Sequence, residues 1–254
     1  MDGILVIDKP AGWTSFDVVN RLRPVLGVKK AGHLGTLDPS ATGVLPVVCG
    51  RATRSSIALD AGVKEYAATL RLGMETDTYD LDGKVVWSAD ASAVTGEAAR
   101  GALMRFMGTI EQIPPMFSSV KHKGVPLYKL ARKGVVVERM PKTVRVFGLE
   151  VVSVNIPDVE FTVICSRGTY IRSICHDAGK SLGCGGCLAR LKRTRCGPFT
   201  IGEAISPLEE RGELIKRLIP LHKALERVAE AVANGPAAVL AKTGSGEGEI
   251  RFLA

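Results

Sequence analysis

Residues 32–42 read GHLGTLDPSAT, a stretch that favours neither a helix nor the interior of a strand. Gly32 and Gly35 allow backbone angles that other residues avoid, and Pro39 pushes the preceding residue toward an extended conformation. Asp38 is therefore expected on a loop. Two interpretations of its carboxylate remain open at this point: a structural one, as an Asx turn or a helix cap, and a catalytic one.

The composition favours a globular chain with an anionic partner. The 254 residues suffice to bury a substantial core. Lys and Arg total 34 against 26 Asp and Glu, and the resulting net charge of +8 favours a partner such as a nucleic acid. No segment approaches the ~20 apolar residues of a membrane span, and no basic segment precedes the first apolar run. We therefore expect a cytoplasmic protein without membrane contact.

The cysteines do not indicate a disulfide scaffold or a metal site. The six thiols are spread through apolar or helical contexts, so we expect them to be reduced and packed in the core. Cys184 and Cys187 have the spacing of half a zinc site, but neither a second cysteine pair nor a suitable histidine pair accompanies them. We predict no metal.

The periodicity of apolar residues predicts a mixture of strands and helices. Thr14 and Asp17 have the spacing of a capping box, and Pro24 is expected to limit the helix that they begin. Residues 80–83 resemble part of a calcium loop, but its first and last ligand positions carry no carboxylate, so we expect a solvated hairpin there. The other expected elements are strands at 3–8, 43–49, 65–73, 84–87, 143–154 and 159–166, and helices at 52–61, 95–107, 125–133 and from Thr169 to Leu182.

Two later segments have patterns that are typical of particular elements. Residues 188–199 carry four basic side chains around Leu191, the usual pattern of a solvated edge strand. Residues 213–232 have the pattern of one amphipathic helix, followed by a Gly-rich segment at 244–248.

Six separated motifs occur in order along the chain. They are Asp8-Lys9-Pro10 with Gly12-Trp13-Thr14-Ser15, residues 32–42, Lys64-Glu65-Tyr66, residues 114–121 (PPMFSSVK), Gly168-Thr169-Tyr170-Ile171-Arg172, and residues 191–199 (LKRTRCGPF). Together they closely resemble the motifs of bacterial tRNA pseudouridine synthases of the TruB type.

The resemblance implies an α+β fold, that of the pseudouridine synthases. It has a mixed, largely antiparallel sheet flanked by helices, with a central active-site cleft and a small inserted subdomain. We expect a catalytic domain over 1–210, with a mobile RNA-clamping insertion around 115–140. Residues 211–254 are expected to form a short C-terminal helix and tail, abbreviated relative to the RNA-binding domain of many family members. We expect this difference to reduce the affinity for the tRNA arm.

The resemblance also implies the reaction and three catalytic residues. The family converts uridine at position 55 of tRNA, in the TΨC loop, into pseudouridine: the C1′–N1 bond breaks and the flipped base is rejoined through C5. Asp38 would act either as a nucleophile or by removing a sugar proton, and the sequence does not choose between these routes. Arg172 would favour the ionised carboxylate, and Tyr66 would stack on the base.

Further residues are implied in substrate binding. His33 would fill the space that the flipped nucleotides leave, and Leu191 would form an apolar wall of the pocket. Lys9 is interpreted as a phosphate contact or as support for the pocket floor. Tyr170 belongs to the motif that contains Arg172. The candidate phosphate contacts are Lys9, Arg51, Arg54, Lys121, Arg190, Lys192, Arg193 and Arg195.

One position departs from the family pattern, and two other classes of function are alternatives. Phe117 stands where the family generally has a tyrosine, so a hydroxyl is missing beside the substrate loop. A non-catalytic RNA-binding protein would use the same basic surface but would not need Asp38, Tyr66 and Arg172 together. An N-glycoside hydrolase would also use a carboxylate on a flipped nucleoside. The resemblance favours a monomeric isomerase that acts on the tRNA T-arm stem-loop without cofactor, metal or protein partner.

Overall fold

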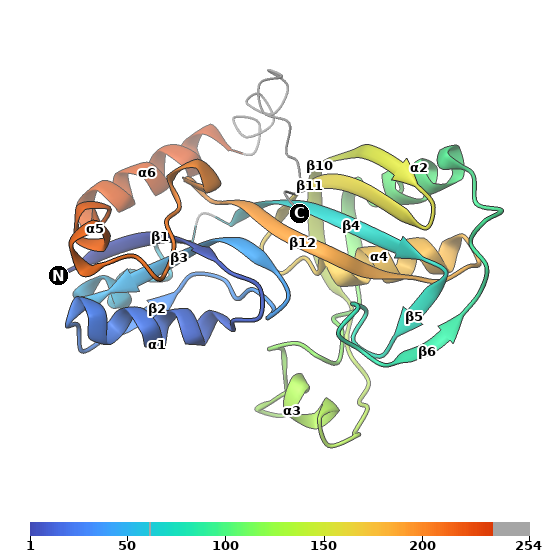
Figure 1. Ribbon diagram of the computed structural model, residues 1–254, viewed down its shortest axis with the longest axis horizontal. Coiled ribbons are helices and arrows are strands. Elements are labelled where there is room, and N and C mark those ends of the chain that lie inside the picture. Colours follow the sequence, from blue (N-terminus) through green and yellow to red (C-terminus); the bar gives the residue numbers. More distant parts are fainter. Residues whose placement is uncertain (61, 236–254) are drawn as a thin grey trace. The chain divides into compact units, whose positions relative to one another are not determined.

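The computed structural model describes residues 1–60 and 62–235 (Figure 1). The chain divides into two compact units. Unit 1 is Met1–Ala67 with the chain from Leu191 onward, and unit 2 is Ala68–Arg190. The chain passes from one unit to the other within two strands, β4 (Val63–Leu72) and β12 (Gly186–Cys196).

Unit 1 is built on an apolar strand pair, β1 (Gly3–Lys9) and β3 (Thr42–Cys49). The two are antiparallel, with Gly3 opposite Cys49 and Lys9 opposite Gly43. The other side of β3 pairs with β2 (Ala31–His33), antiparallel, and with the end of β12, parallel. Two short strands complete this part: β13 (Phe199–Thr200) pairs with β12, and β14 (Ile219–Pro220) pairs with β1.

Helices cover both faces of the unit 1 strands (Figure 1). Alternation along β1 places Ile4 and Val6 on one face, where they pack with Ala224 and Val228 of α6 (Leu221–Asn234). Figure 1 shows α1 (Ser15–Leu26) on the opposite face. The shorter helical elements of this unit are η1 (Gly50–Ser55), η2 (Ile201–Glu203) and α5 (Arg211–Lys216).

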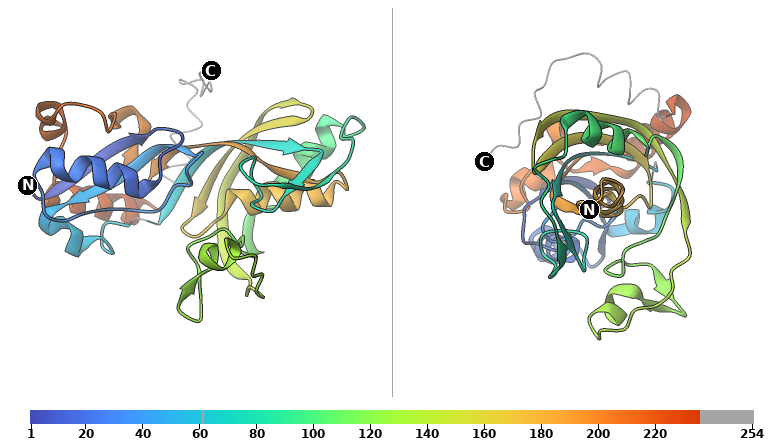
Figure 2. Two further views of the ribbon diagram at one scale, coloured as in Figure 1. Left: turned by 60° about the horizontal axis from the view of Figure 1, so that its bottom comes forward. Right: turned by 90° about the vertical axis from the view of Figure 1, so that its right-hand side faces the viewer.

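Unit 2 contains three neighbouring antiparallel strands in the order β11 (Asp158–Ser166), β10 (Lys142–Asn155) and β7 (Gly108–Gln112). The helix α2 (Gly96–Met104) contacts both β10 and α4 (Ile171–Ser181). A separate hairpin joins β5 (Met74–Thr76) to β6 (Val85–Ser88). Figure 2 shows a small projection away from these strands, made of β8 (Lys121–His122), β9 (Val125–Pro126) and α3 (Leu127–Ala131).

The predicted α+β class with a largely antiparallel arrangement of strands is confirmed, as are all six predicted strands. The capping box is also confirmed, because Thr14 and Asp17 exchange side-chain to backbone hydrogen bonds at the start of α1. All six cysteines lie in the described part and are buried, as expected of core thiols.

Three element predictions are wrong for identifiable reasons. Pro24 lies inside α1, because its missing N–H affects only one late bond and Gly27 closes the last turn in a left-handed conformation. The single helix at 213–232 is two helices, α5 and α6, since Ile219 and Pro220 leave the helix to pair with β1. Residues 188–199 do not form a solvated edge: β12 lies between β3 and β4, where Arg193 is fully buried and Arg195 pairs with Glu65.

Several other elements begin or end at residues that differ from the predicted ones. Thr169 does not cap α4, because its hydroxyl donates to the Ser166 carbonyl and Tyr170 is the cap residue. A hairpin is present around residues 80–83, but β6 pairs with β5 and not with the strand predicted at 65–73, and the connection is not fully solvated, since Asp80 is only 8% exposed. The helices expected at 52–61, 95–107 and 125–133 are shorter than predicted, as η1, α2 and α3. The Gly-rich segment at 244–248 lies outside the described residues.

Candidate active site

Asp38 lies in unit 1 on the loop between β2 and β3, and the residue before it is anchored to α1. The hydroxyl of Ser15, at the start of α1, accepts a hydrogen bond from the Leu37 amide (2.9 Å) and donates to the Leu37 carbonyl (3.1 Å). Ser15 is 2% exposed. A buried hydroxyl that uses both of its functions on one residue restricts the backbone directly before Asp38.

The residue after Asp38 is anchored by a buried lysine. Lys9 at the end of β1 has no exposed surface, and its amino group donates to the carbonyls of Trp13 (2.5 Å), Pro10 (2.8 Å) and Pro39 (3.1 Å). The Gly12 amide also donates to the Pro39 carbonyl (2.9 Å). Burial lowers the pKa of Lys9 to about 8, although the nearby charge of Asp38 acts in the opposite direction.

A buried arginine supports the same loop from β12. Arg193 is fully buried, and its guanidinium donates to the carbonyls of Val44 (2.7 Å) and Gly35 (3.0 Å). Gly43 has a φ of +97°, and a Cβ atom there would lie 2.2 Å from the Arg193 carbonyl oxygen. Only glycine therefore fits where β3 and β12 approach each other. The phosphate-contact interpretation of Lys9 and Arg193 disagrees with their burial; both support the loop instead.

Three more predicted residues lie in unit 1. His33 ends β2, and burial together with the charge of Arg193 lowers its pKa, so its imidazole is neutral near pH 7. Tyr66 lies on β4 and is only 7% exposed. Leu191 is half-buried on β12. These positions agree with pocket-lining roles but equally with packing of the unit.

Arg172 is a predicted site residue in unit 2. It lies in the first turn of α4 and is 4% exposed, so it is not a surface helix residue. Its guanidinium donates to the carbonyls of Phe117 (2.8 Å) and Thr78 (3.0 Å) and lies 3.7 Å from the Asp80 carboxylate. Phe117 thus contributes its backbone oxygen, for which the missing tyrosine hydroxyl is not required.

Tyr170 is held by a residue that the sequence analysis did not single out. The side-chain amide of Gln112, at the end of β7, accepts from the Tyr170 amide (2.7 Å) and donates to the Tyr170 carbonyl (2.9 Å). Gln112 is 3% exposed. The available signal for Gln112 was its place directly before Ile113 and two prolines. Asp80 is a second site residue that the sequence analysis did not single out. Lys121, by contrast, is exposed on β8 and lies in the projection.

The comparisons with known proteins decide the family. The model for TruB family pseudouridylate synthase (N terminal domain) matches residues 23–171, and the model for tRNA pseudouridylate synthase B C-terminal domain matches residues 172–226. The chain belongs to the TruB family. The known activity of this family is the isomerisation of uridine to pseudouridine in tRNA.

Curated relatives and solved structures agree with this assignment. The TruB chain is 52% identical over 206 residues to tRNA pseudouridine synthase B of Geotalea uraniireducens (strain Rf4), covering 81% of this chain and 66% of the relative. It is 50% identical over 230 residues to that of Geobacter sulfurreducens (strain ATCC 51573 / DSM 12127 / PCA), covering 89% and 76%. A Cbf5-Nop10-Gar1 complex contains a chain at 33% identity with a TM-score of 0.68, covering 89% of this chain and 62% of that one.

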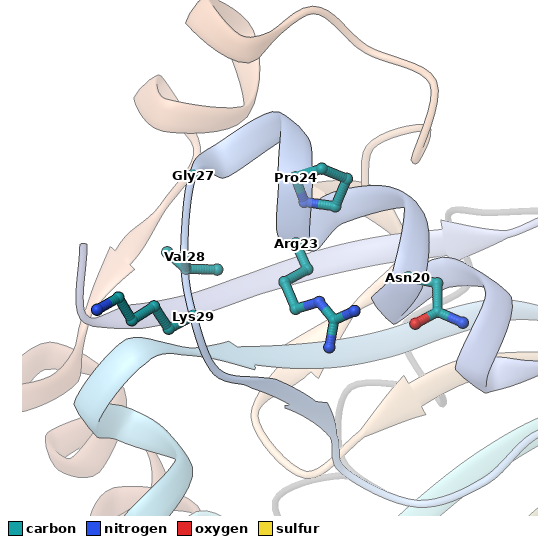
Figure 3. Close-up of a pocket in the computed structure, with 6 residues that line it drawn as sticks. All are labelled: Asn20, Arg23, Pro24, Gly27, Val28 and Lys29. Carbon is teal, nitrogen blue, oxygen red and sulfur yellow. The ribbon is translucent and has the colours of Figure 1, made fainter.

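The TruB chain carries a basic pocket away from the Asp38 loop, at the C-terminal end of α1. A cavity of about 520 Å³ is lined by polar and basic side chains that include Asn20, Arg23 and Lys29 (Figure 3). A neighbouring cavity of about 320 Å³ shares Lys29 and adds Lys30 and Arg54 to its lining. These basic side chains are exposed. The surface is suited to an anion.

Two kinds of feature are absent from the part of the chain that the structure describes. No helix within residues 1–60 and 62–235 is long and apolar enough to span a bilayer. Over those same residues, no three His, Cys, Asp or Glu side chains gather closely enough to hold a metal ion.

Proposed function

We propose that this chain isomerises uridine 55 in the T-arm of tRNA to pseudouridine, with Asp38 as the catalytic carboxylate. The observation that carries the proposal is the anchoring of Asp38 on both sides: Ser15 binds the backbone of Leu37, and buried Lys9 binds the carbonyl of Pro39. A helix cap or an Asx turn does not require such anchors. A group that must reach one atom of a flipped nucleoside does, because small errors in position slow a reaction strongly.

The proposed reaction breaks the C1′–N1 bond and forms a C1′–C5 bond, while the proton on C5 is lost and N1 gains a proton. Asp38 either attacks as a nucleophile or removes a sugar proton that is later returned, so no redox cofactor or energy source is needed. Tyr66 would stack on the base. Arg172 would favour the ionised form of the carboxylate, which is the role that the family resemblance implies for it.

Neutral His33 and half-buried Leu191 are proposed to contact the flipped region of the RNA. We propose that Tyr170, held by Gln112, also contacts the RNA, and that exposed Lys121 contacts it from the projection around 115–140. The protein would work in the cytoplasm as a monomer without a protein partner.

The basic surface around the end of α1 supports RNA as the substrate. Arg23, Lys29, Lys30 and Arg54 line the two neighbouring cavities. Phosphate contacts by such side chains supply much of the affinity for a nucleic acid and make it sensitive to salt. We therefore propose that RNA phosphates, rather than bases, bind this surface.

The test uses tRNA labelled with tritium at C5 of uridine. The wild-type protein is expected to release tritium to water without added metal or nucleotide, and Asp38→Ala is expected to abolish release while the tRNA still binds. The matched control is Asp82→Ala, which alters an exposed carboxylate and is expected to leave release unchanged. Free uracil as the product would show a hydrolase, and binding without release by the wild-type protein would show a non-catalytic RNA-binding protein. Release by Asp38→Ala would refute the assigned catalyst.

A further inference from the structure

The connection between β5 and β6 contains a feature that the proposed function does not use. Tyr79 has a φ of +66°, a left-handed conformation that residues with a side chain rarely adopt. Its ring stacks on the imidazole of His176 in α4, with 3.9 Å between ring centroids and an interplanar angle of 8°. A strained residue that is fixed by its side chain in this way calls for a functional explanation.

The position of Tyr79 in the chain connects this stack with Arg172. The residue before it, Thr78, offers the carbonyl that accepts from the Arg172 guanidinium (3.0 Å). The residue after it, Asp80, places its carboxylate 3.7 Å from the same guanidinium. The left-handed turn at Tyr79 thus lets the residues on both sides of it, Thr78 and Asp80, reach the same guanidinium.

His176 and Arg172 are four residues apart on α4 and therefore lie on the same face of the helix. One face of α4 thus contacts residues 78–80 twice, through the ring of His176 and through the guanidinium of Arg172. The Nδ1 atom of His176 is buried and finds no hydrogen-bond partner among the described residues. The stack on Tyr79 is thus a specific contact of an imidazole whose Nδ1 atom makes no hydrogen bond to the described part of the chain.

Hydrogen bonds also hold the turn, among them two of the Tyr79 backbone. The Tyr79 amide donates to the Thr76 carbonyl (3.2 Å), and its carbonyl accepts from the Leu188 amide (2.9 Å). These two bonds connect Tyr79 to Thr76 within the turn and to Leu188 on β12. The stack with His176 ties it to the helix that carries Arg172.

We propose that Tyr79 and His176 are positioning residues for Arg172. Their stack holds residues 78–80 in the left-handed turn, so that the Thr78 carbonyl and the Asp80 carboxylate fix the direction of the guanidinium. The inference rests on the proposed function, in which Arg172 takes part in the reaction. Neither Tyr79 nor His176 contacts the substrate in this proposal.

The first test removes and then restores the ring at position 176. His176→Ala is expected to lower kcat for tritium release about tenfold, with KM for tRNA unchanged, because a displaced guanidinium impairs the chemical step and not binding. His176→Phe keeps a flat ring and is expected to recover most of kcat. His222→Ala, which changes an exposed histidine of α6 in unit 1, is the matched control and is expected to behave as the wild type.

The second test separates the stack from the strained backbone. Tyr79→Phe keeps the ring and is expected to keep kcat, whereas Tyr79→Gly relieves the strain, loses the ring and is expected to resemble His176→Ala. The double variant Tyr79→Gly with His176→Ala is expected to be no slower than either single variant. All assays are run below the unfolding transition of each variant, recorded by circular dichroism.

Several results would overturn the positioning role. They are unchanged kcat in His176→Ala, failure of His176→Phe to restore it, and multiplicative losses in the double variant. A higher KM at unchanged kcat would also overturn it, because it would indicate a binding role. Failure of the proposed function is recognised separately, since the wild-type protein would then release no tritium.

Discussion

The amino nitrogen of Lys9 lies 3.1 Å from the carbonyl oxygen of Pro39, the residue that follows Asp38. The same nitrogen binds the carbonyls of Pro10 and Trp13, so one buried charge joins the end of β1 to the loop that carries the candidate catalyst. This arrangement explains why a lysine has no exposed surface in an otherwise apolar strand. Three carbonyl oxygens replace the water that its ammonium group has lost.

Lys9→Met is expected to slow catalysis without preventing tRNA binding. Methionine fills a similar volume but donates no hydrogen bond, so Pro39 loses its side-chain anchor and Asp38 samples more positions. We expect kcat for tritium release to fall at least about tenfold, with the dissociation constant for tRNA changed little. Lys223→Met, an exposed substitution on α6, serves as the control. Equal loss of tRNA affinity and kcat would indicate that Lys9 contacts the RNA directly.

The pKa of Lys9 predicts how its contribution to stability depends on pH. Burial lowers this pKa from 10.5 to about 8, so between these values the unfolded chain holds a proton that the folded chain lacks. Folding is therefore favoured as the pH rises through this range, whereas below about pH 8 the cost of burying the charge is fully present. The free energy of unfolding of the wild type relative to Lys9→Met is expected to increase by up to about 3 kcal/mol between pH 7 and pH 10.5. Denaturant titrations at several pH values measure it, and a constant difference would show that folded Lys9 keeps its proton.

The parts of the fold with local causes were predictable from the sequence. Apolar runs bounded by Gly and Pro gave the positions of the main strands, and the Thr14 and Asp17 pair marked the start of α1. The loop character of residues 32–42 also follows from local preferences, because Gly and Pro restrict the backbone wherever they occur.

The interactions that organise the candidate site were not predictable in the same way. Arg193 appeared to be one of several solvated charges, but it is buried because Gly35 and Val44, about 150 residues away, offer it their carbonyls. Gln112 meets Tyr170, 58 residues further along. Asp80 meets Arg172, 92 residues further along. A periodic pattern reports how much a segment is buried but not which distant group will satisfy a polar side chain.

Gly43→Ala and Gly12→Ala form a matched pair that separates steric clash from backbone strain. Both glycines have positive φ angles, +97° and +81°. A Cβ atom at position 12 would meet nothing within 4 Å, whereas at position 43 it would lie 2.2 Å from the carbonyl oxygen of Arg193. We expect Gly12→Ala to cost about 1–2 kcal/mol of unfolding free energy and Gly43→Ala at least about 3 kcal/mol, since the clash adds to the strain. Thermal and denaturant unfolding of both variants measure the difference. Equal losses would show that β12 can move away from β3 at little cost.

Asp80→Asn tests whether the charge of the carboxylate near Arg172 is needed, in addition to its shape. Asparagine keeps an oxygen that accepts from the Thr78 hydroxyl but removes the negative charge 3.7 Å from the guanidinium. Because both side chains are buried, we expect a loss of about 1–3 kcal/mol in the free energy of unfolding and a clear fall in kcat. Asp82→Asn, two residues away and exposed, is expected to change the free energy of unfolding by less than about 0.5 kcal/mol. If both variants matched the wild type in stability and kcat, the charge of Asp80 would not be needed to hold Arg172. A lower kcat at unchanged stability would instead assign the Asp80 charge to the reaction.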